Sequence, residues 1–284
     1  RPGFIILGAG KCGTSSLYHY IMGHPRALPA TEKQIHYFKY YLQKGLGWYY
    51  SHFPTAEFFL SSGALITGEA SPGYLPYPDV AKHIRTTLPH TKLILVAREP
   101  IDRAWSSYKY SYLTPALKSL RAGTSTLPSG NRVPAGQSEE YYLAHHITPF
   151  EDFIRIELDT LARCLRPGGA AETRAKQYTW ANAERERRAA AGLPPLADVI
   201  DACYDNQRLT RAVPRPQWKA LAAAHPNRTL DMRNPLVISE MVGRGLYALQ
   251  AEWYYATGSR AENGVLCVCT EDMGARPEET LDSV

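Results

Sequence analysis

The sequence predicts an α/β fold with a P-loop-type central parallel sheet flanked by helices. Short apolar runs alternate along the chain with segments of helical spacing, a pattern that is typical of parallel sheets. The first apolar run also leads through a glycine-rich turn into a helix. The 284 residues include 44% hydrophobic and 21% charged residues, which is ordinary globular usage. We therefore expect one domain over residues 1–284, with insertions at 114–138 and 166–197.

The expected elements follow in chain order. The run 4–8 is expected to be a strand, and the helix after it to end at about Met22. Later strands are expected at 64–68, 92–97 and 264–269, and later helices at 79–88, 139–165 and 235–255. The segment 114–138 is rich in Ser, Thr, Gly and Pro, which is typical of a surface loop. The segment 166–197 is rich in Gly, Ala and charged residues, which indicates an insertion or a solvated helix.

The five cysteines provide neither a metal-ligand cluster nor a dense disulfide framework. Cys164 and Cys203 flank the second insertion, so they could form a disulfide in an oxidising compartment, and buried thiols are an equally good interpretation. Cys267 and Cys269 stand two apart in an apolar run, which points both to one face of a strand. This placement favours core packing over zinc binding.

The charge of the chain bounds its partners. A formal net charge of +5 suits an anionic donor or a polyanionic acceptor, and we predict no nucleic-acid partner. No apolar run approaches the length of a membrane span, and no stretch resembles a signal peptide. Because Arg1 lies immediately before the first expected strand, we expect that an upstream targeting or anchoring segment has been removed.

A glycine-rich turn joins the first strand to the first helix. Such a turn presents backbone N–H groups and the positive end of the helix dipole to an anion, and Lys11 adds a full charge. The nucleoside triphosphatase pattern G-x-x-x-x-G-K-[ST] places its lysine after the last glycine, whereas Lys11 precedes Gly13. The turn therefore predicts a phosphate loop of another kind, with a plain strand-to-helix connection as the alternative.

The strand at 92–97 supplies a second discriminator. Phosphate-transferring enzymes of the triphosphatase kind usually follow such a strand with an acidic residue that holds magnesium, but here Arg98 follows it. A cation at this point attracts an anion, so the sequence predicts no metal site.

Two separated stretches resemble sulfotransferases in order and spacing. Residues 98–108 resemble their R-x-P-x-x-R-x-x-S-x-x-Y element, and residues 11–15 resemble their K-x-G-T-[ST] loop. Residues 33–38, 68–74 and 244–247 with Trp253 are similar to three further elements of the family. The resemblance is closer to the Golgi glycosaminoglycan enzymes than to the cytosolic enzymes that act on phenols and steroids. Gln34 departs from it, because the family often has glutamate there.

The resemblance implies transfer of a sulfuryl group from 3′-phosphoadenosine 5′-phosphosulfate to a hydroxyl, expected to be that of a carbohydrate, with no metal required. It also implies a Golgi lumen location, as the catalytic part of a membrane-anchored protein. The chain ends at Val284, before the family's C-terminal lysine- and glycine-containing loop, so donor binding by this chain is expected to be incomplete.

The resemblance also implies roles for particular residues. Lys11 would neutralise charge on the donor, in a cradle made with Cys12, Gly13, Thr14 and Ser15. Arg98 and Ser106 would bind the 3′-phosphate, while Arg103 fits a structural ion pair better.

For the catalytic base the prediction is Glu69, and His36 is the competing base. Lys33 would contact the sulfuryl oxygens or an anionic sugar, although a surface lysine is nearly as good an interpretation. The aromatic residues of 37–50 are expected to pack in the core.

Two other functions remain open. A P-loop kinase or other nucleotide phosphotransferase would need magnesium and would prefer adenosine triphosphate to the 3′-phosphorylated donor. A non-catalytic nucleotide- or glycan-binding module would bind without turnover. Metal-free sulfate transfer would exclude both.

Overall fold

The computed structural model describes residues 1–122, 138–146, 149–165, 189–192, 241–256, 264–282 and 284. The chain divides into two compact units, which are described here one at a time. The first consists of Arg1–Glu99, Tyr178–Ala197 and Leu246–Val284, and the second of Pro100–Gln177 and Asp198–Gly245.

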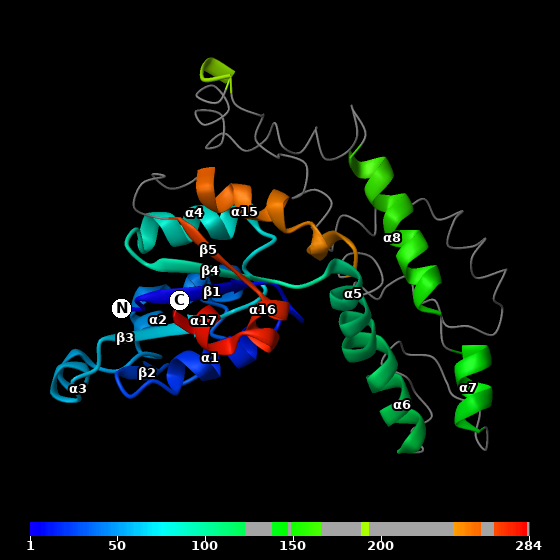
Figure 1. The fold of residues 1–284 in the computed structure, drawn as a ribbon, viewed down its shortest axis with the longest axis horizontal. Helices are drawn as coiled ribbons and strands as arrows, with labels where there is room; N and C mark the ends of the chain where they lie inside the picture. The colour runs from blue at the N-terminus through cyan, green and yellow to red at the C-terminus, as the bar shows by residue number, and fades with distance from the viewer. Residues whose placement is uncertain (123–137, 147–148, 166–188, 193–240, 257–263, 283) are drawn as a thin grey trace. The chain divides into compact units, whose positions relative to one another are not determined.

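The first unit is built on a five-stranded parallel sheet with the strand order β2-β3-β1-β4-β5 (Figure 1). The strands are β1 Phe4–Gly8, β2 Ala27–Pro29, β3 Ile66–Ala70, β4 Lys92–Ala97 and β5 Val265–Cys269. The sheet confirms the predicted fold class. Three of the four predicted strands lie within a residue of their expected bounds, β3 is shifted by two residues, and β2 was not predicted because three residues carry too little periodicity.

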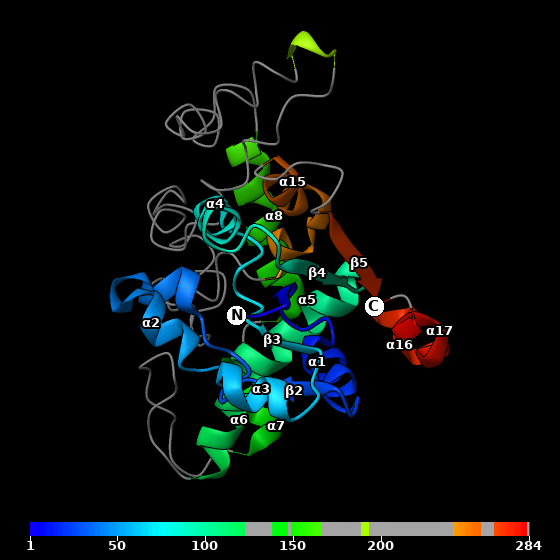
Figure 2. The ribbon, with the colours of Figure 1, turned by 90° about the vertical axis from the view of Figure 1, so that its left-hand side faces the viewer.

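Helices cover both faces of this sheet. In Figures 1 and 2, α4 and α15 lie on one side of the sheet and α1 lies on the other. The helices of this unit are α1 Thr14–Met22, η1 Tyr37–Tyr41, η2 Leu42–Lys44, α2 Gly45–Tyr50, α3 Ala56–Ser61, α4 Pro78–Thr87, α15 Tyr247–Ala256, α16 Thr270–Ala275 and α17 Pro277–Asp282. Because parallel strands are covered on both faces, every residue of β1 is buried.

The second unit, where described, is helical. Its elements are α5 Pro100–Tyr108, η3 Lys109–Leu113, α6 Thr114–Arg121, α7 Glu139–His146, α8 Phe150–Leu165 and η4 Gly243–Gly245. Tyr108, Tyr112 and Phe153 pack ring against ring in its core. Arg103 is buried and donates a hydrogen bond to the Met241 carbonyl, and Glu157 accepts from the Met241 N–H. This burial agrees with the structural role expected for Arg103.

Several sequence predictions need correction. The start of the expected loop at 114–138 is helix α6, because Pro115 occupies the first turn, where its missing N–H costs nothing. The expected helix at 139–165 is two helices, α7 and α8, with Pro149 in the break. Residues 123–137 and 166–188 lie outside the described residues.

Of the predicted helix at 235–255, residues 247–255 belong to α15, whereas Gly243–Gly245 form a tight 3₁₀ turn. Residues 235–240 are outside the described part. Cys267 and Cys269 do share a face of β5, but both are exposed, so the core prediction was wrong. β5 is the edge strand of the sheet, and Val265 and Val268 are its buried members. Cys203 lies outside the described residues, so its pairing with Cys164 stays a prediction.

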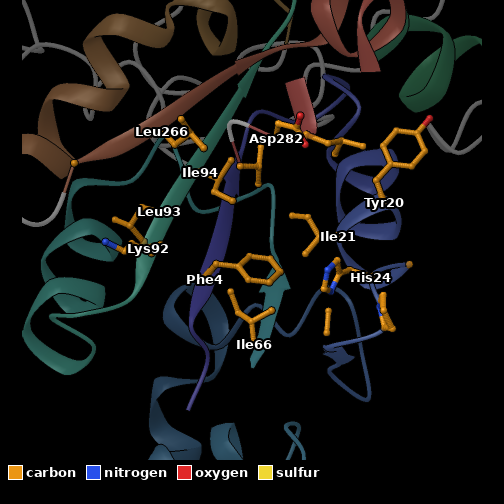
Figure 3. A pocket seen from close by; sticks show the side chains of 16 residues that line it. Phe4, Tyr20, Ile21, His24, Ile66, Lys92, Leu93, Ile94, Leu266 and Asp282 are labelled. Atoms are coloured by element: carbon orange, nitrogen blue, oxygen red, sulfur yellow. The ribbon is translucent and has the colours of Figure 1, made fainter. Parts of the chain in front are cut away.

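A cavity of about 730 Å³ opens beside α1 (Figure 3). Phe4, Ile66 and Lys92, which begin β1, β3 and β4, are among its lining residues. The cavity therefore lies toward the amino ends of the strands. Ligands of open α/β sheets bind at the carboxyl ends, which is the opposite edge of the sheet.

Candidate functional site

The phosphate loop connects the carboxyl end of β1 to α1. Gly13 has φ +80° and Lys11 has φ +71°, so both adopt the left-handed conformation that lets the backbone turn sharply into the helix. At Gly8 a side chain would meet the Pro72 carbonyl oxygen at 2.9 Å, so only glycine fits. Beside Gly10 a Cβ would meet nothing within 4 Å, so no described atom packs closely against the loop at that point.

Lys11 and Arg98 are close enough to interact. They follow β1 and β4, which are neighbours in the sheet, and both side chains are half-buried. Burial lowers the pKa of Lys11, and the positive charge of Arg98 lowers it further. Two cations held near each other at the carboxyl ends of parallel strands favour a bound anion, which would relieve their repulsion.

The structure gives the burial and the position of the other predicted donor-site residues. Thr14 and Cys12 are buried, while Ser15 in the first turn of α1 is exposed. The N-cap residue of α1 is Gly13, which has no side chain to cap the helix. A helix start of this kind can bind an anion through its backbone N–H groups. Ser106 is a half-buried residue of α5 in the second unit. Its convergence with Arg98 on one phosphate stays a prediction.

Thr270 and Tyr247, which follow the second insertion, contact the phosphate loop, and neither hydroxyl was among the predicted site residues. Thr270 Oγ1 lies 2.7 Å from the Cys12 carbonyl oxygen and 2.8 Å from the Ala97 carbonyl oxygen. Tyr247 Oη donates to the Arg98 carbonyl oxygen at 2.9 Å and lies 3.4 Å from Cys12 Sγ. For Thr270 the signal was its position directly after an apolar strand, and for Tyr247 it was its place in the stretch 244–247 that resembles a family element.

Glu69 lies inside β3 rather than directly after it, and it has no exposed surface. Its carboxylate accepts hydrogen bonds from Tyr49 Oη at 2.8 Å and Ser71 Oγ at 2.6 Å, and from Tyr74 Oη at 3.3 Å. Burial raises the pKa of Glu69 to about 7, and these hydrogen bonds oppose the rise. Because the carboxylate has no exposed surface, an acceptor cannot reach it in this structure, and its role as the base stays a prediction.

His36 is the more accessible of the two candidate bases. Its φ of +54° is unusual for a residue with a side chain, and its N–H donates to Ser71 Oγ at 3.1 Å. Its Nε2 lies 3.2 Å from Gln34 Oε1, and its Nδ1 has no hydrogen-bond partner among the described residues. Burial lowers the pKa of His36, and the charges of Lys39 and Lys33 lower it further, which favours the neutral ring that can take a proton.

Lys33 is held beside the same strand end, because its carbonyl accepts from the Ala70 N–H at 2.9 Å. Burial lowers the pKa of its half-buried amine. The segment 33–38 therefore presents Lys33 and His36 next to Glu69 and Ser71. Of the neighbouring aromatic residues, Tyr37 and Tyr49 are core residues as expected, whereas Tyr40 is exposed.

Within the described residues, no group of three or more His, Cys, Asp or Glu side chains is arranged to hold a metal ion. In the same part of the chain, no helix has the length and apolar character needed to cross a membrane.

Comparison with known proteins relates the chain to sulfotransferases. It is 37% identical over 110 residues to "Membrane-associated sulfotransferase kil1" of Dictyostelium discoideum, covering 39% of this chain and 23% of that protein. It is 34% identical over 122 residues to human "Heparan sulfate glucosamine 3-O-sulfotransferase 6", covering 43% and 34%. It is 28% identical over 116 residues to "Bifunctional heparan sulfate N-deacetylase/N-sulfotransferase 1" of Caenorhabditis elegans, covering 38% and 13%.

No protein-family model matches the chain. The chain spans about a third or less of the length of each of these curated relatives. The similarity agrees with the parallel sheet, the phosphate loop and the arginine that follows β4. By sequence, this chain is similar to named sulfotransferases over 38% to 43% of its length.

Proposed function

We propose that this chain transfers a sulfuryl group from 3′-phosphoadenosine 5′-phosphosulfate to a hydroxyl of a carbohydrate. The observation that carries the proposal is the interacting pair Lys11 and Arg98, held at the carboxyl ends of β1 and β4 beside a glycine-rich loop. A triphosphatase would have a magnesium-binding acid at the position of Arg98. The relationship to named sulfotransferases supports the same reading.

The residues divide between the two ends of the donor. Lys11 and the N–H groups at the start of α1 would bind the phosphosulfate, and Arg98 with Ser106 would bind the 3′-phosphate. The acceptor oxygen attacks sulfur in line, and the bond from sulfur to the bridging oxygen breaks. The acceptor's proton goes to a base, Glu69 or His36, and adenosine 3′,5′-bisphosphate leaves with the charge that Lys11 stabilises.

The acceptor proposal rests on what the relatives' names say they act on. Two of them are named for heparan sulfate, one as an O-sulfotransferase and one as an N-sulfotransferase. We place the acceptor among carbohydrate hydroxyls, with a carbohydrate amine as the second candidate. The relative named as membrane-associated supports a membrane-anchored protein, and we propose that its catalytic part faces the Golgi lumen.

The decisive experiment is sulfate transfer without metal. The chain is incubated with labelled donor and chelator, and with O-desulfated or N-desulfated polysaccharide, simple alcohols or tyrosine peptides as acceptors. We expect transfer to a polysaccharide, and Lys11→Ala should lower both turnover and donor affinity because the lysine charge meets the donor before and during the reaction. Phosphate transfer from adenosine triphosphate that needs magnesium would support a kinase instead. Tight bisphosphate binding with no transfer to any acceptor would support the binding module.

A further inference from the structure

We propose that Thr270 and Tyr247 are positioning residues that lock the phosphate loop to the end of β4, so that Lys11 and Arg98 are already in place when the donor arrives. The inference rests on the proposed function, because it assumes that these two cations bind the donor. Neither hydroxyl belongs to the predicted donor-binding residues, and both come from the C-terminal part of the first unit.

The first tie is the Thr270 hydroxyl. Its single hydrogen faces two carbonyl oxygens, those of Cys12 at 2.7 Å and Ala97 at 2.8 Å. Cys12 directly follows Lys11 in the chain, and Ala97 directly precedes Arg98. One hydroxyl therefore contacts the backbone next to both cations, and a methyl group in its place would leave the Cys12 and Ala97 carbonyls without this donor.

The second tie is Tyr247, at the start of α15. Its Oη donates to the Arg98 carbonyl oxygen at 2.9 Å and lies 3.4 Å from Cys12 Sγ. It thus joins the same two segments from a different helix. α15 itself packs against α4, and Tyr254 further along α15 donates to the Tyr74 carbonyl oxygen at 2.7 Å. The helix that carries Tyr247 is therefore held in place by other contacts.

The need for such ties follows from charge. Burial lowers the pKa of Lys11, and repulsion from the nearby charge of Arg98 lowers it further. If the two segments could separate, the donor would have to bring them together, and that cost would weaken its binding. The hydrogen bonds of Thr270 and Tyr247 go to uncharged backbone carbonyls, so they fix the two segments without placing a negative charge beside either cation.

The test compares isosteric variants with matched controls. Thr270→Val removes the hydroxyl and keeps the shape, and Thr270→Ser restores it. The control Thr280→Val, within α17, removes a hydroxyl that donates to the carbonyl oxygen of Arg276, just before that helix. Tyr247→Phe is paired with Tyr255→Phe, which loses a bond to the Val265 carbonyl oxygen at the other end of α15. For each protein, calorimetry gives the Kd for adenosine 3′,5′-bisphosphate, and initial rates give KM for donor and for acceptor.

We expect Thr270→Val and Tyr247→Phe each to raise the bisphosphate Kd and the donor KM by about threefold to tenfold. The acceptor KM should stay at the parental value, Thr270→Ser should recover most of the affinity, and the two control variants should bind like the parent. A purely structural role would lower thermal stability in the controls and the test variants alike without a selective effect on the donor.

Different results would contradict the proposed function and the positioning role. If the parental chain does not bind the bisphosphate, the donor assignment fails and the proposed function fails with it. If the parent binds and the test variants bind equally well, or lose no more than their controls, the positioning role is wrong while the proposed function stands. If Thr270→Val does not fold, the comparison of Tyr247→Phe with Tyr255→Phe decides.

Discussion

Arg98 is the residue on which donor identity depends most. It follows β4 directly and lies near Lys11, and we assign it to the 3′-phosphate, the group that separates the sulfate donor from ordinary adenine nucleotides. We expect Arg98→Ala to erase the preference for adenosine 3′,5′-bisphosphate over adenosine monophosphate, by a factor of about 10 to 100 for one charge-assisted hydrogen bond of about 1.5 to 3 kcal/mol. Calorimetric titration with both nucleotides measures this.

The matched control for Arg98 is Arg26→Ala, an exposed arginine just before β2 in the same unit. It should leave both affinities unchanged. Equal affinity of the parental chain for the two nucleotides would count against the assignment of Arg98.

Glu69 and His36 are the two candidates for the catalytic base, and the pH dependence of turnover distinguishes them. Glu69 has a pKa of about 7, and as a base it must be ionised, so turnover would rise with pH up to about 7. His36 has a pKa lowered from its ordinary value of 6.5, so as the base it would give a rise that is complete at lower pH. The pH profile of kcat for the parent, Glu69→Gln and His36→Ala distinguishes them.

If Glu69 is the base, Glu69→Gln should lower turnover by about 10² to 10⁴ with little change in bisphosphate affinity, and the acidic limb should disappear. Near-parental turnover in Glu69→Gln, together with loss of turnover in His36→Ala, would move the base to His36. In that case the buried carboxylate, which holds Tyr49, Ser71 and Tyr74, acts as a support for the segment that carries His36.

At the scale of elements, the contact between β3 and β1 sets a strict size limit at Gly68. A Cβ there would lie 2.6 Å from Phe4 ring carbons and 2.6 Å from the Phe4 carbonyl oxygen. Because the backbone of a central strand cannot move aside, we expect Gly68→Ala to destabilise the chain by more than about 3 kcal/mol or to prevent folding. Urea unfolding followed by circular dichroism measures the change.

Gly47→Ala is the control for this substitution, because a Cβ at that helical position meets nothing within 4 Å. Alanine there should be neutral or stabilise α2 by about 0.5 to 1 kcal/mol. Equal effects of the two substitutions would show that the packing of β3 against β1 is described wrongly.

At the scale of the whole molecule, buried carboxyl groups predict how stability changes with pH. Burial raises the pKa of Glu69, and separately that of Glu157 in the second unit, from 4.5 to about 7. Between these values the folded chain binds more protons than the unfolded chain. The stability that these groups contribute is therefore complete below about pH 4.5 and is lost as pH rises through about 7.

Between pH 5 and pH 8, we expect the free energy of unfolding of the parental chain to fall by on the order of 1 to 3 kcal/mol relative to that of Glu69→Gln. The measurement is the difference in free energy of unfolding between the two proteins at each pH. Glu57→Gln, which changes an exposed glutamate of α3, should follow the parent throughout. A difference between parent and Glu69→Gln that does not vary with pH would contradict the raised pKa.

Much of the first unit could be predicted from the sequence, because the relevant signals are local. The apolar runs at 4–8 and 92–97 form central strands whose side chains are buried on both faces, and the glycines between β1 and α1 accept conformations that other residues rarely adopt. The order of lysine and glycine in the loop and the arginine after β4 are likewise local, so a donor-binding side could be predicted from the sequence alone.

The tertiary structure decided what depends on residues far apart in the chain. Thr270 reaches Cys12 across 258 positions, and no periodicity within either segment indicates that contact. Glu69 directly follows the strand expected at 64–68, but it lies inside β3, where Tyr49, Ser71 and Tyr74 donate hydrogen bonds to its carboxylate. Cys267 and Cys269 looked like core residues, but their strand lies at the edge of the sheet. Burial and hydrogen bonding are properties of the packed chain, because the same side chain is exposed or enclosed according to which distant segments fold against it.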